Sequence, residues 1–296
     1  MEGAHSLNSS VPITVNVGNC VSFRLYRDTQ PHCLEISPLQ KGLILLLSSN
    51  ELVDEGIGFG VPLVMYEDKT YFSSSADVPQ LRGNNNVLIK SFVLDTISRK
   101  RVGKVSYIND NLYSFLRRIF EKGYLNCKKL FPLFNLIMAL RKTLNVQTDF
   151  MKATPRGTVT VTYTCLPDSV HVHVDFIKLK REGCKQILLL NEQGATFFRK
   201  YSDTTGLSFS DYNIRAWAMV KAEEASLSDI AELLSFTLRR VKSAQLFRGW
   251  ERTRGRFSWA GLSYSLPADS SSFDYVIKLH MNSPEESQES VVKRFV

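Results

Sequence analysis

The feature of this sequence that most restricts its fold is a strict alternation of apolar and polar residues in two adjacent segments. Residues 158–165 read T-V-T-V-T-Y-T-C and, after the turn L-P-D-S, residues 170–176 read V-H-V-H-V-D-F. A period of two places alternate side chains on opposite faces of a β-strand. The two segments therefore predict an antiparallel hairpin with one buried face and one polar face.

The same alternation recurs on both sides of the middle of the chain. It is found in residues 11–17 (V-P-I-T-V-N-V). Residues 87–95 (V-L-I-K-S-F-V-L-D) and 273–281 (F-D-Y-V-I-K-L-H-M) also read as strands, and turn residues lie between such segments. Many short strands separated by turns are typical of sandwich folds. We therefore predict a mainly β protein, a large antiparallel β sandwich built either as one unit or as two sandwich halves.

Two segments have helical rather than strand periodicity. Residues 109–145 contain two amphipathic stretches whose apolar residues recur every three or four positions. Further along, Ser226 and Asp229 resemble a capping box, and the apolar residues that follow keep helical spacing. We predict a helical insert at about 109–145 and a further helix near 227–244. The resulting division is an N-terminal β half (1–108), the insert (109–145), a C-terminal β half with one helix (146–282) and a loose polar tail (283–296).

Charge and cysteine usage limit the partners and the environment. The chain of 296 residues carries a net charge of +8, which favours polyanionic partners. Its five cysteines form no C-x-x-C pair, so neither a disulfide framework nor a zinc site is indicated. The longest apolar stretch, 130–140, contains Pro132 and is much shorter than the roughly 20 residues of a membrane helix. We expect a cytoplasmic protein with free thiols and without membrane association, cofactor or metal.

Two histidines and an aspartate form the first candidate site. His171, His173 and Asp175 fall on one face of the predicted strand, and the threonines of the preceding segment face the same way. Imidazole and carboxylate groups can serve as general acid and base, or can ligate a metal. No further spaced His or Cys completes a metal motif, so we predict His171, His173 and Asp175 as catalytic residues. The alternative is an ordinary solvated face of a sheet.

A basic and aromatic stretch forms the second candidate site. Arginine binds phosphate, sulfate or carboxylate, and aromatic rings stack on bases or sugars. Within residues 239–259 we predict the ligand-binding residues Arg248, Trp250, Arg252, Arg254 and Arg256. Alternation places Arg254 and Arg256 opposite the neighbouring aromatic residues, so the competing interpretation is an aromatic core beneath a solvated basic face.

The glycine-rich segment G-I-G-F-G-V-P, residues 56–62, superficially resembles a nucleotide-binding loop. Such a loop opens a helix, whereas here a strand-like segment follows Pro62. We predict that these glycines permit a tight loop or a bulge, or let a ligand approach the backbone.

Three functions fit these features, and the sequence does not decide whether the protein is an enzyme. By analogy with other β sandwiches, the first is a carbohydrate-binding or carbohydrate-modifying protein with a preference for acidic glycans. The second is a non-enzymatic module that binds nucleic acid or another polyanion through the basic stretch. The third is a structural protein that forms homo-oligomers through the helical insert.

Overall fold

The computed structural model describes most of the chain outside one long central segment. The described residues are 12–18, 20–26, 30–31, 38–53, 57–67, 69–77, 79–82, 86–102, 146–210, 217–253 and 257–282. The chain forms two compact units, residues 1–97 with 152–296 and residues 98–151. The predicted helical insert and polar tail lie outside the described residues.

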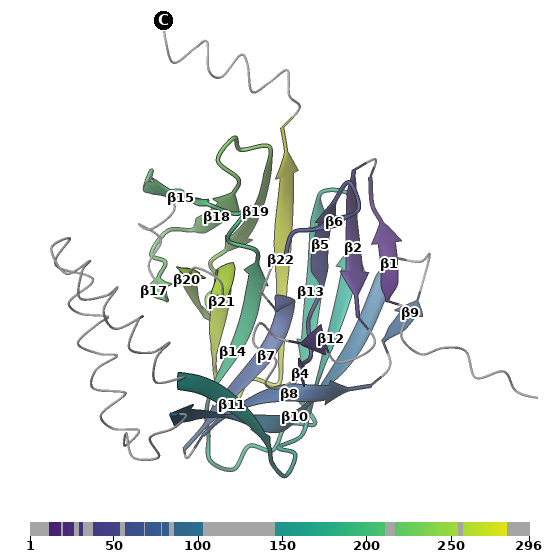
Figure 1. Ribbon diagram of the computed structural model, residues 1–296, viewed down its shortest axis with the longest axis vertical. Helices are drawn as coiled ribbons and strands as arrows, with labels where there is room; N and C mark the ends of the chain where they lie inside the picture. Colours follow the sequence, from purple (N-terminus) through teal and green to yellow (C-terminus); the bar gives the residue numbers. More distant parts are fainter. Residues whose placement is uncertain are drawn as a thin grey trace, which may run out of the picture. The chain divides into compact units, whose positions relative to one another are not determined.

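All regular elements of the described residues are β-strands (Figure 1). In the first part of the chain they are β1 (Ile13–Asn16), β2 (Val21–Leu25), β3 (Gln30–Pro31), β4 (Pro38–Leu39), β5 (Ile44–Leu47), β6 (Asn50–Glu51), β7 (Gly58–Tyr66), β8 (Thr70–Ala76), β9 (Gln80–Arg82) and β10 (Val87–Val102). The later strands are β11 (Val146–Lys152), β12 (Thr158–Cys165), β13 (Ser169–Asp175), β14 (Cys184–Gln193), β15 (Lys200–Asp203), β16 (Ser208–Ser210), β17 (Ala218–Met219), β18 (Glu224–Ser228), β19 (Leu234–Arg239), β20 (Gln245–Thr253), β21 (Phe257–Pro267) and β22 (Ser272–Met281). Within this part of the chain no helix has the length and hydropathy that crossing a membrane requires.

One antiparallel sheet supplies both layers of the larger unit. The strand order is β16-β15-β18-β19-β22-β13-β12-β10 and continues as β8-β7-β14-β21-β20-β17. The two halves of this order meet at β10, which pairs with β12 over residues 87–93 and with β8 over residues 92–97. Register shifts on either side of Leu94 mark bulges at this junction, and bulges bend and twist strands. A separate sheet, β1-β2-β5-β6, contributes Phe23 and Leu45 to the same core.

Aromatic residues from the two halves of the sheet pack against each other. Phe59 of β7 meets Phe236 of β19 with ring centroids 5.1 Å apart. The hydroxyl of Tyr163 on β12 donates to the carbonyl of Phe59 (2.9 Å), and that of Tyr275 on β22 donates to Asn191 Oδ1 on β14 (2.8 Å). The core thus lies between two sheet layers, which confirms the prediction of a mainly β, antiparallel, sandwich-like fold.

The predicted hairpin of residues 158–176 forms as β12 and β13. Tyr163 pairs with Val172, and Thr162 pairs with His173. Val159, Val161 and Tyr163 are fully buried, whereas the threonines between them are half-buried. The alternation in the sequence therefore corresponds directly to a core face and a solvent face.

The predicted helix near 227–244 is wrong. This segment is instead the end of β18, a turn and β19, with Leu227 opposite Phe236. Asp229, whose position suggested a capping box, accepts hydrogen bonds from the backbone amides of Ala231 and Leu234 and so closes the turn. Leu-Ser-Phe-Thr-Leu, residues 234–238, buries every second side chain, and this period-two pattern prevails over the helical spacing.

Gly58 and Gly60 lie in β7, where other parts of the protein approach the backbone closely. Gly58 and Gly60 have φ angles of 85° and 73°, a region that favours glycine. A Cβ atom at Gly60 would lie 2.8 Å from the hydroxyl oxygen of Tyr163, and one at Gly58 would lie 2.8 Å from the carbonyl oxygen of Leu43. The spacing of these glycines reflects packing of the core against the β7 backbone.

Candidate functional site

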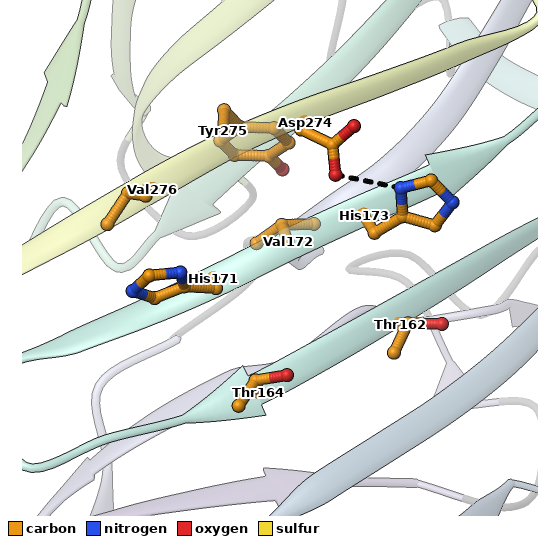
Figure 2. Close-up of a pocket in the computed structure, with 8 residues that line it drawn as sticks. All are labelled: Thr162, Thr164, His171, Val172, His173, Asp274, Tyr275 and Val276. Atoms are coloured by element: carbon orange, nitrogen blue, oxygen red, sulfur yellow. Dashed lines mark hydrogen bonds and ion pairs between the residues drawn. The ribbon is translucent and has the colours of Figure 1, made fainter.

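Three neighbouring strands, β12, β13 and β22, carry polar side chains on the face that points away from the core. Across these strands Thr162 lies opposite His173, and His173 lies opposite Asp274. In the next row of the same face, His171 lies between Thr164 and Val276. Strand pairing alone therefore gathers two imidazoles, two hydroxyls and one carboxylate (Figure 2).

His173 and Asp274 form a direct polar pair. Nδ1 of His173 lies 2.8 Å from Oδ1 of Asp274, and the two side chains are 50% and 73% exposed. A proton on Nδ1 would be held by the carboxylate, which leaves Nε2 as the nitrogen free to accept a proton. An imidazole oriented in this way by a carboxylate is a recurrent arrangement in acid–base catalysis.

The pair opens onto a shallow depression of about 360 Å³. Its lining consists of residues from the same three strands, namely Thr162, Thr164, His171, Val172, His173, Asp274, Tyr275 and Val276 (Figure 2). Val172 and Tyr275 are themselves buried, so the polar groups available to a ligand are the hydroxyls, the imidazoles and the carboxylate.

The predicted residues of the first site divide between two locations. His171 and His173 line the depression, as strand alternation indicated. Asp175 lies at the end of β13, and its Oδ1 accepts a hydrogen bond of 2.7 Å from the backbone amide of Ile177. The carboxylate that meets His173 is Asp274, which the sequence analysis did not single out. The sequence indicates the position of Asp274 only through the strand pattern of residues 273–281, which places this carboxylate on the polar side of a strand.

In the basic stretch, Arg248 and Trp250 lie on the side of β20 that faces the core. Leu246 and Trp250 are buried in the core, and Arg248 lies between them on the same side of β20. The guanidinium of Arg248 packs over the rings of Tyr201 and Phe209, 4.3 and 4.6 Å from their centroids. The structure therefore separates Arg248 and Trp250 from the two histidines. The side chain of Arg252, and the whole of Arg254 and Arg256, lie outside the described residues.

Two other cations lie on the polar face beside the depression. Lys278 pairs in register with Ser169 and Thr237, and its Nζ lies 3.1 Å from Oε1 of Glu224. Arg239 is exposed and follows Leu238, whose partner is Ile277. Continuing that register by one residue places Arg239 beside Val276, at the rim of the depression.

The described residues contain no cluster of three or more His, Cys, Asp or Glu side chains arranged to hold a metal ion. Three of the five cysteines are described, and all three are free thiols. Cys20 is exposed, Cys184 is half-buried and Cys165 is buried. Burial raises the pKa of Cys165 to about 12, so this thiol is protonated at neutral pH.

Comparison with known proteins gives a distant likeness in structure alone. No family model matches the chain, and no curated protein matches its sequence. A galactose mutarotase-like protein from Lactobacillus casei is 10% identical, with 92% of this chain and 100% of that one covered and a TM-score of 0.38. A glycoside hydrolase family 97 enzyme from Pseudoalteromonas sp. strain K8 is 9% identical over 90% of this chain and 35% of that one, with a TM-score of 0.37. The Slr1438 protein from Synechocystis sp. PCC 6803 is 8% identical over 95% of this chain and 100% of that one, with a TM-score of 0.34. Likenesses at this level support no conclusion about the fold or the chemistry of this chain.

Proposed function

We propose that the depression on β12, β13 and β22 binds carbohydrate, and that His173 and Asp274 act on the bound sugar as an acid–base pair. The observation that carries the proposal is the 2.8 Å contact between His173 Nδ1 and Asp274 Oδ1 within an open depression that also presents threonine hydroxyls. The pair provides a proton acceptor whose orientation is fixed.

The polar groups of the depression match the hydrogen-bonding needs of a sugar. Each sugar hydroxyl both donates and accepts a hydrogen bond. Thr162 and Thr164 offer groups that do both, the imidazole of His171 offers one donor and one acceptor, His173 offers an acceptor at Nε2, and Asp274 offers acceptors. The open shape admits one residue of a longer glycan without enclosing it. A small apolar ligand would find little buried apolar surface here.

The chemistry available to this arrangement is proton transfer. Nε2 of His173 can take a proton from a sugar hydroxyl while Asp274 stabilises the imidazolium through Nδ1. His171, on the same strand face, can in its protonated form donate its own proton to another oxygen of the sugar. A positioned acid or base of this kind contributes roughly 10²- to 10⁴-fold to a rate.

The proposal includes a preference for acidic sugars, because of the cations at the rim. Among the described residues Lys278 forms an ion pair with Glu224 and Arg240 with Glu223. Arg239 lies opposite Glu224 in the register of β18 and β19 but forms no ion pair with it. An exposed guanidinium beside Val276 is suited to hold a carboxylate or sulfate on the ligand. The chain's net charge of +8 attracts such ligands over longer distances.

The first experiment tests the histidine. Binding and turnover are measured on a panel of neutral and acidic oligosaccharides for the wild type, His173→Ala, Asp274→Asn and the control His280→Ala. His280 is an exposed histidine on β22 that pairs with Ser235 and does not line the depression. We expect about tenfold weaker binding or at least 10²-fold slower turnover for the first two variants only. Equal behaviour of His173→Ala and His280→Ala towards a confirmed ligand would remove the pair from the site.

The second experiment tests the acidic preference. Arg239→Ala is compared with Arg240→Ala, a neighbouring arginine whose Nη2 lies 2.7 Å from Glu223 Oε1. We expect Arg239→Ala to weaken binding of a uronic-acid oligosaccharide about tenfold and to leave the neutral analogue unaffected. A similar loss for both sugars, or for both variants, would contradict a role of Arg239 in charge recognition.

The other two predicted functions have less support. A nucleic-acid surface along the basic stretch would not include Arg248 or Trp250, because both lie on the core side of β20. Oligomerisation through residues 109–145 stays a prediction, since that insert lies outside the described residues.

A further inference from the structure

Arg248 combines a core-facing position with a charge that cannot be removed. It follows Leu246 and precedes Trp250 on the side of β20 that packs into the core. Arginine does not lose its proton in proteins, so the charge persists on burial. A buried charge is retained at low cost only when groups of opposite charge or hydrogen-bond acceptors surround it.

Aromatic rings supply part of this compensation. The guanidinium carbon of Arg248 lies 4.3 Å from the ring centroid of Tyr201 and 4.6 Å from that of Phe209. The two rings are stacked on each other with an interplanar angle of 20°. Ring faces attract a cation, but they provide no acceptor in the plane of the guanidinium, where its N–H groups point.

Two of the N–H groups of Arg248 are buried without an acceptor. Among the described residues neither Nε nor Nη1 has a hydrogen-bond partner, and both atoms are shielded from solvent. The nearby carboxylate, Asp203, is engaged elsewhere. It accepts hydrogen bonds from the Tyr201 hydroxyl (2.7 Å) and from the amide (2.9 Å) and hydroxyl of Thr205. Buried donors without partners are rare in native proteins and often mark the position of a bound ion or water.

We propose that Arg248 is the centre of an anion-binding site between β20 and the β15–β16 hairpin, separate from the proposed carbohydrate site. Its ligand is a small oxyanion, either a carboxylate or a sulfate or phosphate group, which accepts from Nε or Nη1. A neutral ligand would not compensate the charge, and a halide lacks the several acceptor atoms of an oxyanion. Tyr201 and Phe209 contact the flat side of the guanidinium, so an anion would bind at its edge, where the buried Nε and Nη1 point.

The test uses sodium sulfate, phosphate and acetate as probes against sodium chloride at equal ionic strength. Thermal unfolding and isothermal titration calorimetry are measured for the wild type, Arg248→Met and the control Arg240→Met, which removes an exposed arginine. At ten times its Kd, a bound oxyanion raises the Tm by about 2–3 °C. We expect this rise, and heat of binding at one site, in the wild type and Arg240→Met only. The probe with the lowest Kd distinguishes a carboxylate ligand from a phosphate or sulfate ligand.

The comparison also controls for general salt effects, because sulfate and phosphate stabilise many proteins by exclusion from their surface. Equal Tm shifts in the wild type and Arg248→Met, or no binding heat with any of the three anions, would overturn the proposal. If Arg248→Met does not fold, Arg248→Lys replaces it, and we expect at least tenfold weaker binding from this variant. Wild-type affinity in Arg248→Lys would then count against the site. None of these measurements depends on His173 or Asp274, so the two proposals can fail independently.

Discussion

Replacement of Gly60 by alanine tests the close packing of the core against β7. An alanine there takes on a left-handed backbone conformation, which costs about 1–2 kcal/mol. Its Cβ atom would also lie 2.8 Å from the hydroxyl oxygen and 2.9 Å from Cε1 of Tyr163, closer than Cβ contacts normally come. Overpacking of this kind costs about 1–3 kcal/mol. We therefore expect Gly60→Ala to lower the free energy of unfolding by about 2–5 kcal/mol.

The matched control is Gly206→Ala. Gly206 has a φ angle of 85°, and a Cβ atom built on it meets nothing within 4 Å. This variant should lose only the backbone contribution of about 1–2 kcal/mol. Urea unfolding monitored by circular dichroism and fluorescence gives both values, provided that the slopes agree. A second comparison places Gly60→Ala in a Tyr163→Phe background, where the cost should fall by about 1 kcal/mol because the hydroxyl contact is gone.

The reasoning would be refuted if Gly60→Ala and Gly206→Ala had the same cost. If Tyr163→Phe left the cost of Gly60→Ala unchanged, the hydroxyl contact would contribute nothing, because phenylalanine keeps the ring contact at Cε1.

Three further predictions concern titration, thiol chemistry and the corrected strand. Burial raises the pKa of Asp203, but its hydrogen bonds lower that pKa more, so the folded-state value lies below the unfolded one. Asp203→Asn should therefore cost about 1–2 kcal/mol at pH 7, and the difference should disappear as pH falls through the folded-state pKa, in unfolding curves recorded from pH 7 to 2. Iodoacetamide at pH 8 should label exposed Cys20 in the native protein but not Cys165, as seen by peptide mass spectrometry, and equal labelling would contradict the burial of Cys165. Leu238→Ala should destabilise by about 2–5 kcal/mol and Ile230→Ala, 51% exposed, by less than about 0.5 kcal/mol, whereas a helix with both residues on its apolar face would give similar losses.

Alternation in the sequence was sufficient to predict the strands that carry His171 and His173 and the face on which they lie. It could not predict which strand would lie beside them. Asp274 is 101 residues from His173 in the chain, and the pairing of β13 with β22 depends on the complete sheet order. Strand pattern specifies the two faces of each strand, whereas the neighbour of a strand is determined by how all the apolar faces are buried together.

In two segments, different local sequence patterns predict different structures. Residues 226–241 fit both a helical and a strand period, and the turn formed by Asp229 decides for strands. In the basic stretch, Leu246, Arg248 and Trp250 are spaced by two, so a strand interpretation would have placed the arginine on an apolar side. Charge alone groups Arg248 with the other arginines of the stretch, but the apolar residues two positions away on either side are the better guide to its location.

The position of β22 in the sheet order has a consequence for how the protein folds. This strand, residues 272–281, is the last described strand of the chain, yet it lies between β13 and β19 and pairs with both (Figure 1). During synthesis β13 and β19 therefore have exposed, unpaired edges until β22 has emerged from the ribosome. Pairings between segments so distant in sequence also slow folding, because a long loop must close before they gain any contacts. A chain that stops before residue 272 should accordingly aggregate rather than form a smaller version of the same sandwich, and chaperones that cover strand edges should affect the yield of the full chain.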